Sequence, residues 1–184
     1  MAGRTIARLL PHPTTTATPV DTVTATMAWT NGGALAIAFR ATGEIESLRI
    51  PPRCVPARAD GLWRRTCFEV FVMAGDGPAY HELNFSPSGE WAAYAFRRYR
   101  EGEPLAVALE PAVVVRQDRE ALQLDALAPA ACLPRAGKGQ GLRVGLAAVL
   151  EGLDGTLSYW ALSHPASRPD FHHPDSRVLA VAWQ

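Results

Sequence analysis

Apolar and polar residues alternate with a period of two over much of the chain, beginning close to residue 20. Over residues 23–29, valine, alanine, methionine and tryptophan alternate with threonine and alanine. This pattern is typical of a β-strand that buries one face. The turn-forming sequence Asn-Gly-Gly follows at 31–33, and a second alternating run covers 35–39. The two runs and the turn between them predict a β-hairpin.

Similar alternation, or a short apolar run, recurs in later segments that are separated by turn-forming residues. These segments cover residues 66–73, 80–85, 90–96, 112–117, 121–127, 142–150, 157–162 and 178–183. No long window has the 3.6-residue period of an amphipathic helix. About ten strands separated by turns predict an all-β fold, an antiparallel β-sandwich of the immunoglobulin-like or jelly-roll kind. A closed barrel is the main alternative.

The chain length of 184 residues predicts one domain with short tails. Residues 11–19 are rich in proline and threonine, which disfavour a helix. We therefore expect residues 1–19 to form an extended N-terminal lead-in and residues 20–184 to form a single sandwich domain.

The charge balance narrows the classes of partner. Lysine and arginine together number 18, aspartate and glutamate also number 18, and the formal net charge is zero. A neutral chain lacks the basic surface of a protein that binds nucleic acid or a polybasic membrane site. No apolar run approaches the ~20 residues of a membrane span. We expect neither a nucleic acid nor a membrane as partner, and the sequence leaves the oligomeric state open.

The cysteines and the N-terminal sequence indicate a cellular compartment. Cys54, Cys67 and Cys132 are widely spaced and form no C-x-x-C pair, which argues against a disulfide framework or a zinc ribbon. The N-terminal apolar run stops at Pro11, so it is shorter than the roughly 7–15 apolar residues of a secretory signal. Both features predict a protein of a reducing compartment, the cytoplasm.

Motifs that identify an enzyme are missing from the sequence. They include the P-loop, the dinucleotide-binding glycine motif, the G-x-S-x-G nucleophile motif and the H-E-x-x-H zinc motif. We therefore expect no catalytic residues and no enzymatic activity.

A carboxylate stands inside the strongly apolar strand predicted at residues 66–73. Alternation places Glu69 on the face opposite Phe68 and Val70. If that face is buried, the carboxylate requires a partner, because an unpaired buried charge is costly. Two interpretations stay open, an ion pair with an arginine within the fold and a contact with a bound ligand.

The next predicted hairpin, residues 80–96, has further polar residues on one face. Residues 83 and 85 are apolar and mark the core face, so Glu82 and Asn84 lie on the opposite face. The return strand adds Trp91, Tyr94 and Arg97. Aromatic rings stack on the C–H face of a sugar and planar polar side chains bind its hydroxyls, so this set favours a polyol or sugar ligand. An outer sheet face with ordinary cross-strand pairs is the alternative.

Three motifs, in this order, resemble the DOMON-like superfamily. They are Trp63 with Glu69 six residues later, His-Glu-Leu-Asn-Phe-Ser-Pro-Ser-Gly-Glu-Trp at 81–91, and Pro-Asp-Phe-His-His-Pro at 169–174. Within that superfamily the chain is most similar to the family 9 carbohydrate-binding modules and their bacterial DOMON-like relatives, from about residue 62 to the C-terminus. The resemblance implies an immunoglobulin-like or jelly-roll β-sandwich, which agrees with the strand pattern.

The resemblance also implies site residues. In the sugar-binding modules a tryptophan six residues before a strand glutamate lines the site, and Trp63 and Glu69 keep that spacing. Glu82 and Asn84 match a polar residue and an asparagine on the next site strand. The well-known sugar binders have arginine at the first of these two positions, so the glutamate here replaces a hydrogen-bond donor with an acceptor.

The C-terminal region contributes the remaining candidates. A second aromatic wall comes from this region in the sugar-binding modules, and Trp160 and Phe171 are both candidates for it. His172 and His173 lie together in a proline-rich loop. Neighbouring side chains in an extended segment diverge, which favours a hydrogen bond from His172 within the loop over a shared metal ion. His172 is also a candidate ligand contact.

Other DOMON domains bind haem through a methionine and a histidine, but no methionine here has an obvious histidine partner. We therefore expect no haem and no metal cofactor. The sequence predicts a non-catalytic module that binds a small carbohydrate-like ligand. A structural or protein-interaction sandwich, including one that associates with its own copies, is the alternative, and a haem or metal redox domain comes third.

Overall fold

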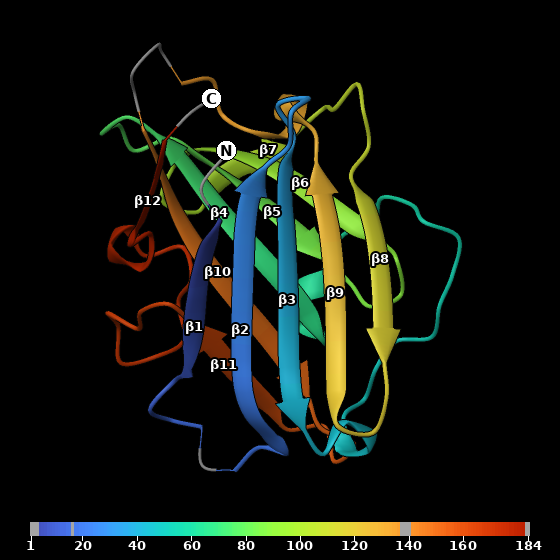
Figure 1. Cartoon of the computed structure of the whole chain (residues 1–184). Helices are drawn as coiled ribbons and strands as arrows, with labels where there is room; N and C mark the ends of the chain where they lie inside the picture. The colour runs from blue at the N-terminus through green and yellow to red at the C-terminus, as the bar shows by residue number, and fades with distance from the viewer. Residues whose placement is uncertain (1–3, 16, 137–140, 183–184) are drawn as a thin grey trace.

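Two layers of antiparallel strands lie face to face, and the strands of one layer run obliquely across those of the other (Figure 1). The computed structural model describes residues 4–15, 17–136 and 141–182. The strands of the first layer are β1 (Thr5–Pro11), β2 (Val20–Trp29), β3 (Leu35–Gly43), β8 (Ala112–Gln117) and β9 (Ala121–Ala128). Those of the second layer are β4 (Cys67–Ala74), β5 (Tyr80–Phe85), β6 (Trp91–Arg98), β7 (Glu101–Pro104), β10 (Gly141–Glu151), β11 (Leu157–Ala161) and β12 (Leu179–Ala182).

The order of pairing runs β7-β6-β5-β4-β10-β11 through the second layer and continues as β1-β2-β3-β9-β8 through the first, with β12 also paired to β10. Among the described strands this path is open, because β7 and β8 stand at its two ends. The all-β antiparallel sandwich predicted from the sequence is confirmed, and the closed barrel is not formed. Short 3₁₀ helices connect some strands, namely η1 (Ile45–Ser47), η2 (Leu62–Arg64), η3 (Ala130–Cys132) and η4 (Pro174–Ser176).

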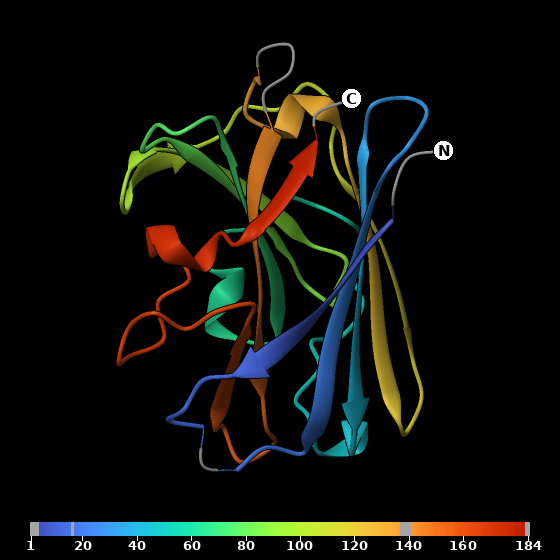
Figure 2. The same cartoon turned by 60° about the vertical axis from the view of Figure 1, so that its left-hand side comes forward.

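Strand β1 joins the two layers. Figure 2 shows it crossing obliquely from one layer to the other. Its first five residues pair with β2, and its last two, Leu10 and Pro11, are in register with Ala161 and Trp160 of β11. The domain boundary expected at residue 20 therefore falls between two paired strands. The apolar pattern of β1 is weak because only Leu9 of the strand is fully buried.

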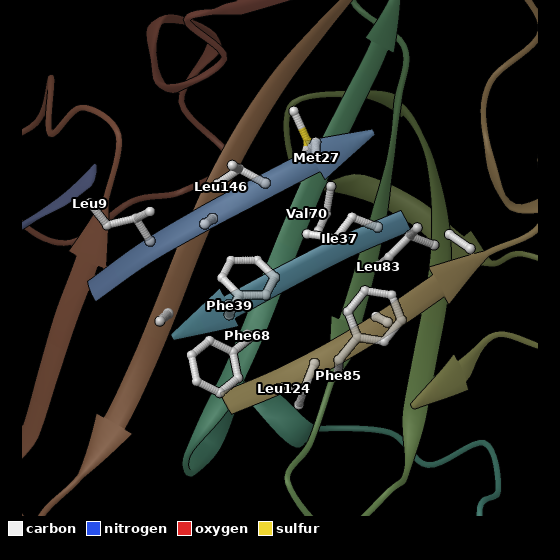
Figure 3. Packing of buried hydrophobic residues seen from close by; sticks show 14 of the residues in the cluster. Leu9, Met27, Ile37, Phe39, Phe68, Val70, Leu83, Phe85, Leu124 and Leu146 are labelled. Atoms are coloured by element: carbon white, nitrogen blue, oxygen red, sulfur yellow. The ribbon is translucent and has the colours of Figure 1, made fainter. Parts of the chain in front are cut away.

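The main core lies between the layers, and most of its residues are ones that the period-two pattern marks. Figure 3 shows Ile37 and Phe39 of β3 among side chains from the second layer, including Phe68, Leu83 and Phe85. The rings of Phe39 and Phe68 stack with their centroids 5.0 Å apart, which connects the layers directly. Burial of this apolar surface supplies most of the driving force for folding.

The second layer is also buried on part of its outer face. Phe71 of β4, Tyr80 of β5 and Val149 of β10 form a smaller cluster there with Phe171 from the segment between β11 and β12. This segment packs over one side of the outer face and buries the side chains there. The end of the last predicted strand, residue 183, lies outside the described residues. No helix in the described part of the chain is long and apolar enough to cross a membrane.

Candidate ligand-binding site

A pocket of about 670 Å³ opens on the outer face of the second layer. This volume is within the range of roughly 300–1,000 Å³ that small-molecule sites occupy. Five aromatic residues line it, namely Trp63, Tyr94, Phe96, Tyr159 and Phe171. Its charged or ionisable polar lining consists of Arg64, Glu69, Glu82, Arg100 and His172. The walls therefore come from η2, from strands β4, β5, β6, β10 and β11, from the turn after β6, and from the loops after β1 and before β12.

Six residues that the sequence predicted for the site line this pocket. They are Trp63, Glu69, Glu82, Tyr94, Phe171 and His172. A seventh, Asn84, lies beside them, because its Nδ2 group donates a hydrogen bond to Glu82 Oε1 at 2.8 Å. The strand register explains why these residues lie close together, since Glu69 stands opposite Asn84 and Glu82 stands opposite Tyr94.

Three predicted residues lie elsewhere. Trp91 is in register with Phe85 and shares its core face, where the indole is 2% exposed. Trp91 and Tyr94 are three positions apart, so the alternation of a strand places them on opposite faces. Trp160 is also buried in the core between the layers. Arg97 is exposed and lies 3.8 Å from Glu101 in an ion pair outside the pocket.

Eight lining residues were not predicted from the sequence, namely Thr14, Arg64, Phe96, Arg100, Val149, Leu157, Tyr159 and Pro169. Alternation could have found Phe96, because it follows Tyr94 by two positions on β6. It stacks on Tyr80 with the centroids 4.8 Å apart and the planes 3° from parallel. Arg100 has no such signal, because its position depends on a turn after β6 in which its φ is 55°.

Glu69 and Glu82 form a buried pair of carboxylates on neighbouring strands. Their residues are 3% and 4% exposed. Burial and the nearby charge of Glu82 raise the pKa of Glu69 well above its usual value. Burial raises the pKa of Glu82 to about 7, although the hydrogen bond from Asn84 and the charge of Arg100 oppose this shift.

The Glu69 carboxylate has no internal partner in the described part of the chain. Its Oε1 atom is buried without a hydrogen bond, and no arginine lies within ion-pair distance of it. The interpretation of Glu69 as one half of an internal ion pair is therefore wrong for the described residues. Glu151 differs, because its carboxylate lies 3.3 Å from Arg49.

His172 is held by two polar contacts at the wall of the pocket. Its Nδ1 atom is 2.8 Å from the Tyr80 hydroxyl, which also accepts a hydrogen bond from the backbone N–H of Arg100 at 3.2 Å. In the tautomer that carries its proton on Nε2, the tyrosine hydroxyl donates to Nδ1, and the Nε2 atom faces Glu82 Oε2 at 3.6 Å. Burial, followed by the charge of Arg100, lowers the pKa of His172 to about 4, so the ring is neutral at pH 7.

The Arg100 guanidinium makes its hydrogen bonds outside the carboxylate pair. Its Nη2 group lies 2.9 Å from Asp170 Oδ1, and its Nε group donates to the Tyr99 hydroxyl at 3.1 Å. Tyr99 in turn donates to Asp170 Oδ2 at 2.8 Å. These bonds fix Arg100 at the rim, where its charge acts on the glutamates over a distance.

Trp63 gives the pocket an exposed aromatic wall. Gly61 adopts a left-handed conformation with φ 73° and begins η2, which carries the tryptophan. The Trp63 residue is 49% exposed, and the guanidinium of Arg64 lies 5.2 Å from the ring centroid. The Tyr94 hydroxyl donates to Asp60 at 2.8 Å and so links β6 to the loop before η2. Such a partly exposed ring is available to stack on a ligand.

Within residues 4–15, 17–136 and 141–182, no group of three or more His, Cys, Asp or Glu side chains is arranged to hold a metal ion.

Comparison with solved structures identifies the fold as that of carbohydrate-binding β-sandwich modules. A candidate carbohydrate-binding protein from Bacteroides uniformis superposes with a TM-score of 0.74 and 13% identity, over 98% of this chain and 86% of that one. A family 9 carbohydrate-binding module from Caldicellulosiruptor kristjanssonii in complex with glucose gives a TM-score of 0.58 at 10% identity, over 96% and 83% of the two chains. The cellotriose complex of such a module from the same organism gives 0.56 at 9% identity, over 96% and 82%.

Sequence comparison adds no closer assignment, because neither a protein-family model nor a curated protein matches the chain. The three structural neighbours thus establish the class of fold.

Proposed function

We propose that this protein is a non-catalytic module that binds a small carbohydrate in the pocket on the outer face of its second layer. The observation that carries the proposal is the convergence of Trp63, Glu69 and Glu82, from η2, β4 and β5, in one open pocket. A pyranose stacks its C–H face on an aromatic plane, and its hydroxyls donate hydrogen bonds to carboxylate oxygens. Both requirements are met within one site.

The similarity of the fold to modules that were solved with glucose and with cellotriose supports the same proposal. The composition of the pocket does so as well. Ligand sites combine many apolar wall atoms with a small number of placed polar groups. Here five aromatic side chains line the same pocket as two carboxylates, two guanidinium groups and a neutral imidazole.

Calorimetric titration with a panel of neutral sugars tests the proposal. The panel contains D-glucose, D-galactose, D-mannose, cellobiose, maltose and cellotriose. We expect saturable binding of at least one of them, unchanged in Arg97→Ala, since that side chain is exposed outside the pocket. Failure of every sugar on this panel, together with failure of the amino sugar tested below, would overturn the assignment.

The non-catalytic part of the proposal needs its own measurement. Glycosidases also use a pair of carboxylates, one of them with a raised pKa. Wild-type protein is therefore incubated with cellobiose and with cellotriose, and the products are separated by chromatography. We expect no cleavage beyond that of a buffer control, and cleavage that Glu82→Gln abolishes would identify an enzyme instead.

A further inference from the structure

The Glu69–Glu82 pair in the wall of the pocket has carboxylate oxygens that no donor of the described residues satisfies. Glu69 Oε1 has no partner among the described residues, and Glu82 contributes a second carboxylate to the same wall. The Tyr94 hydroxyl is committed to Asp60, and the Arg100 guanidinium to Asp170 and Tyr99. The Nε2 atom of His172 lies 3.6 Å from Glu82 Oε2, beyond the length of a hydrogen bond.

Buried carboxylates without an internal partner are costly, and a second carboxylate nearby increases the cost. The arginines around the pocket do not remove it. Arg100 is paired with Asp170 at 2.9 Å, Arg64 lies over the exposed Trp63 ring, and Arg177 lies over the Tyr80 ring at 4.5 Å. A ligand that brings a positive charge to Glu69 and Glu82 would therefore gain most from this wall.

A protonated primary amine has the matching chemistry. An ammonium group has three hydrogen-bond donors and no acceptor, whereas a hydroxyl is both donor and acceptor. Aromatic faces also attract a cation placed within about 6 Å of the ring centroid. Tyr94 and Phe96 line the same pocket as the carboxylates and have faces of this kind.

We propose that the sugar taken by this pocket is an amino sugar, whose ammonium group is received by the Glu69–Glu82 pair while its ring stacks on Trp63. This inference rests on the function proposed above and specifies its ligand class. It also gives a role to Glu82, because a carboxylate at this position accepts hydrogen bonds from the ammonium group, whereas an arginine there would repel it.

Calorimetric titration of the wild-type chain at neutral pH with four probes tests the inference. The probes are D-glucosamine, D-glucose, N-acetyl-D-glucosamine and cyclohexylamine. A charge-assisted hydrogen bond to a carboxylate is stronger than a neutral one, so we expect D-glucosamine to bind at least about tenfold more tightly than D-glucose. N-acetyl-D-glucosamine, which lacks the charge, should lose this advantage.

Substitutions of the two glutamates test whether they produce the preference for D-glucosamine over D-glucose. Glu69→Gln should bring the affinities for D-glucosamine and D-glucose to within about threefold of each other, because the amide carries no negative charge. Glu103→Gln on the exposed strand β7 is the matched control and should keep the full preference. Circular dichroism checks that each variant is folded. Glu82→Gln, which should also reduce the preference, is the second variant should Glu69→Gln fail to fold.

The outcomes separate the two proposals. D-glucose binding as tightly as D-glucosamine to the wild-type chain would overturn the amino-sugar inference and leave carbohydrate binding standing. Cyclohexylamine binding as tightly as D-glucosamine would show that the sugar hydroxyls contribute nothing and would overturn the amino-sugar inference; if no neutral sugar binds either, it would overturn the carbohydrate assignment as well. A preference for D-glucosamine that survives in both Glu69→Gln and Glu82→Gln would refute the assigned role of the carboxylate pair.

Discussion

Replacing Trp63 with alanine tests whether the exposed indole is a wall of the ligand site. The residue is 49% exposed. An indole side chain of about 250 Å² therefore leaves roughly 120 Å² accessible, of which a sugar ring stacked on one face covers about 80 Å². At about 25 cal/mol per Å², this contact contributes ~2 kcal/mol to binding. Trp63→Ala should thus weaken the binding of a sugar about 30-fold.

The matched control is the same substitution at a buried tryptophan. The Trp91 residue is 2% exposed in the core between the layers. Trp91→Ala should lower the free energy of unfolding by about 3–5 kcal/mol, whereas Trp63→Ala should change it by about 1 kcal/mol or less. Calorimetric titration measures the affinity, and thermal unfolding measures the stability.

Two results would refute the reasoning. Wild-type affinity in a folded Trp63→Ala variant would show that the ring does not touch the ligand. A fall in melting temperature as large as that of Trp91→Ala would show that Trp63 belongs to the packing of the fold, and the loss of binding would then carry no information on the site.

Two further predictions concern stability. Burial raises the pKa of Glu82 to about 7 from an ordinary 4.5, so the folded chain holds this proton more tightly than the unfolded chain. The stability that the bound proton contributes is therefore full below pH 4.5 and is lost as the pH rises through 7. Relative to wild type, Glu82→Gln should therefore raise the melting temperature by about 5 °C near pH 8 and little near pH 5, and equal shifts at both pH values would contradict the assigned burial. Gly43 has a φ of +139°, and a Cβ there would lie 2.3 Å from the carbonyl oxygen of Pro19. Gly43→Ala should lower the free energy of unfolding, measured by chemical denaturation, by about 1–3 kcal/mol or more. Gly77→Ala, whose Cβ meets nothing within 4 Å, should leave it unchanged, and equal effects of the two substitutions would be inconsistent with this geometry.

Most of the strands could be predicted from the sequence because each buries alternate residues in one core. Strand β2 illustrates this, since its burial alternates along nearly its whole length. Strands β1 and β7 were not predicted. The apolar residues Ile6 and Leu10 of β1 are more than half exposed, and β7 is exposed throughout. Such strands are held by backbone pairing with their neighbours, which leaves little trace in the order of side chains.

Strand alternation predicted only the part of the candidate site that lies on regular strands. Alternation correctly separated Glu82 and Asn84 from the core face of β5, and it would also have excluded Trp91 had the face of each β6 residue been counted. Two other lining residues, Arg100 and Tyr159, were not predicted. Arg100 lines the pocket because of its own left-handed conformation in the turn after β6, and Tyr159 does so because the β10–β11 hairpin places it opposite Val149.

The two buried glutamates are the part of the structure that folding alone does not explain. Glu151 is also buried, but it is paired with Arg49 at 3.3 Å, as a structural carboxylate requires. Glu69 has no equivalent partner in the described residues, and the charge of Glu82 in the same pocket repels it. An apolar residue at either position would relieve this repulsion and desolvation. The pair faces an open pocket rather than the core, where the amino sugar proposed above would supply the missing donors.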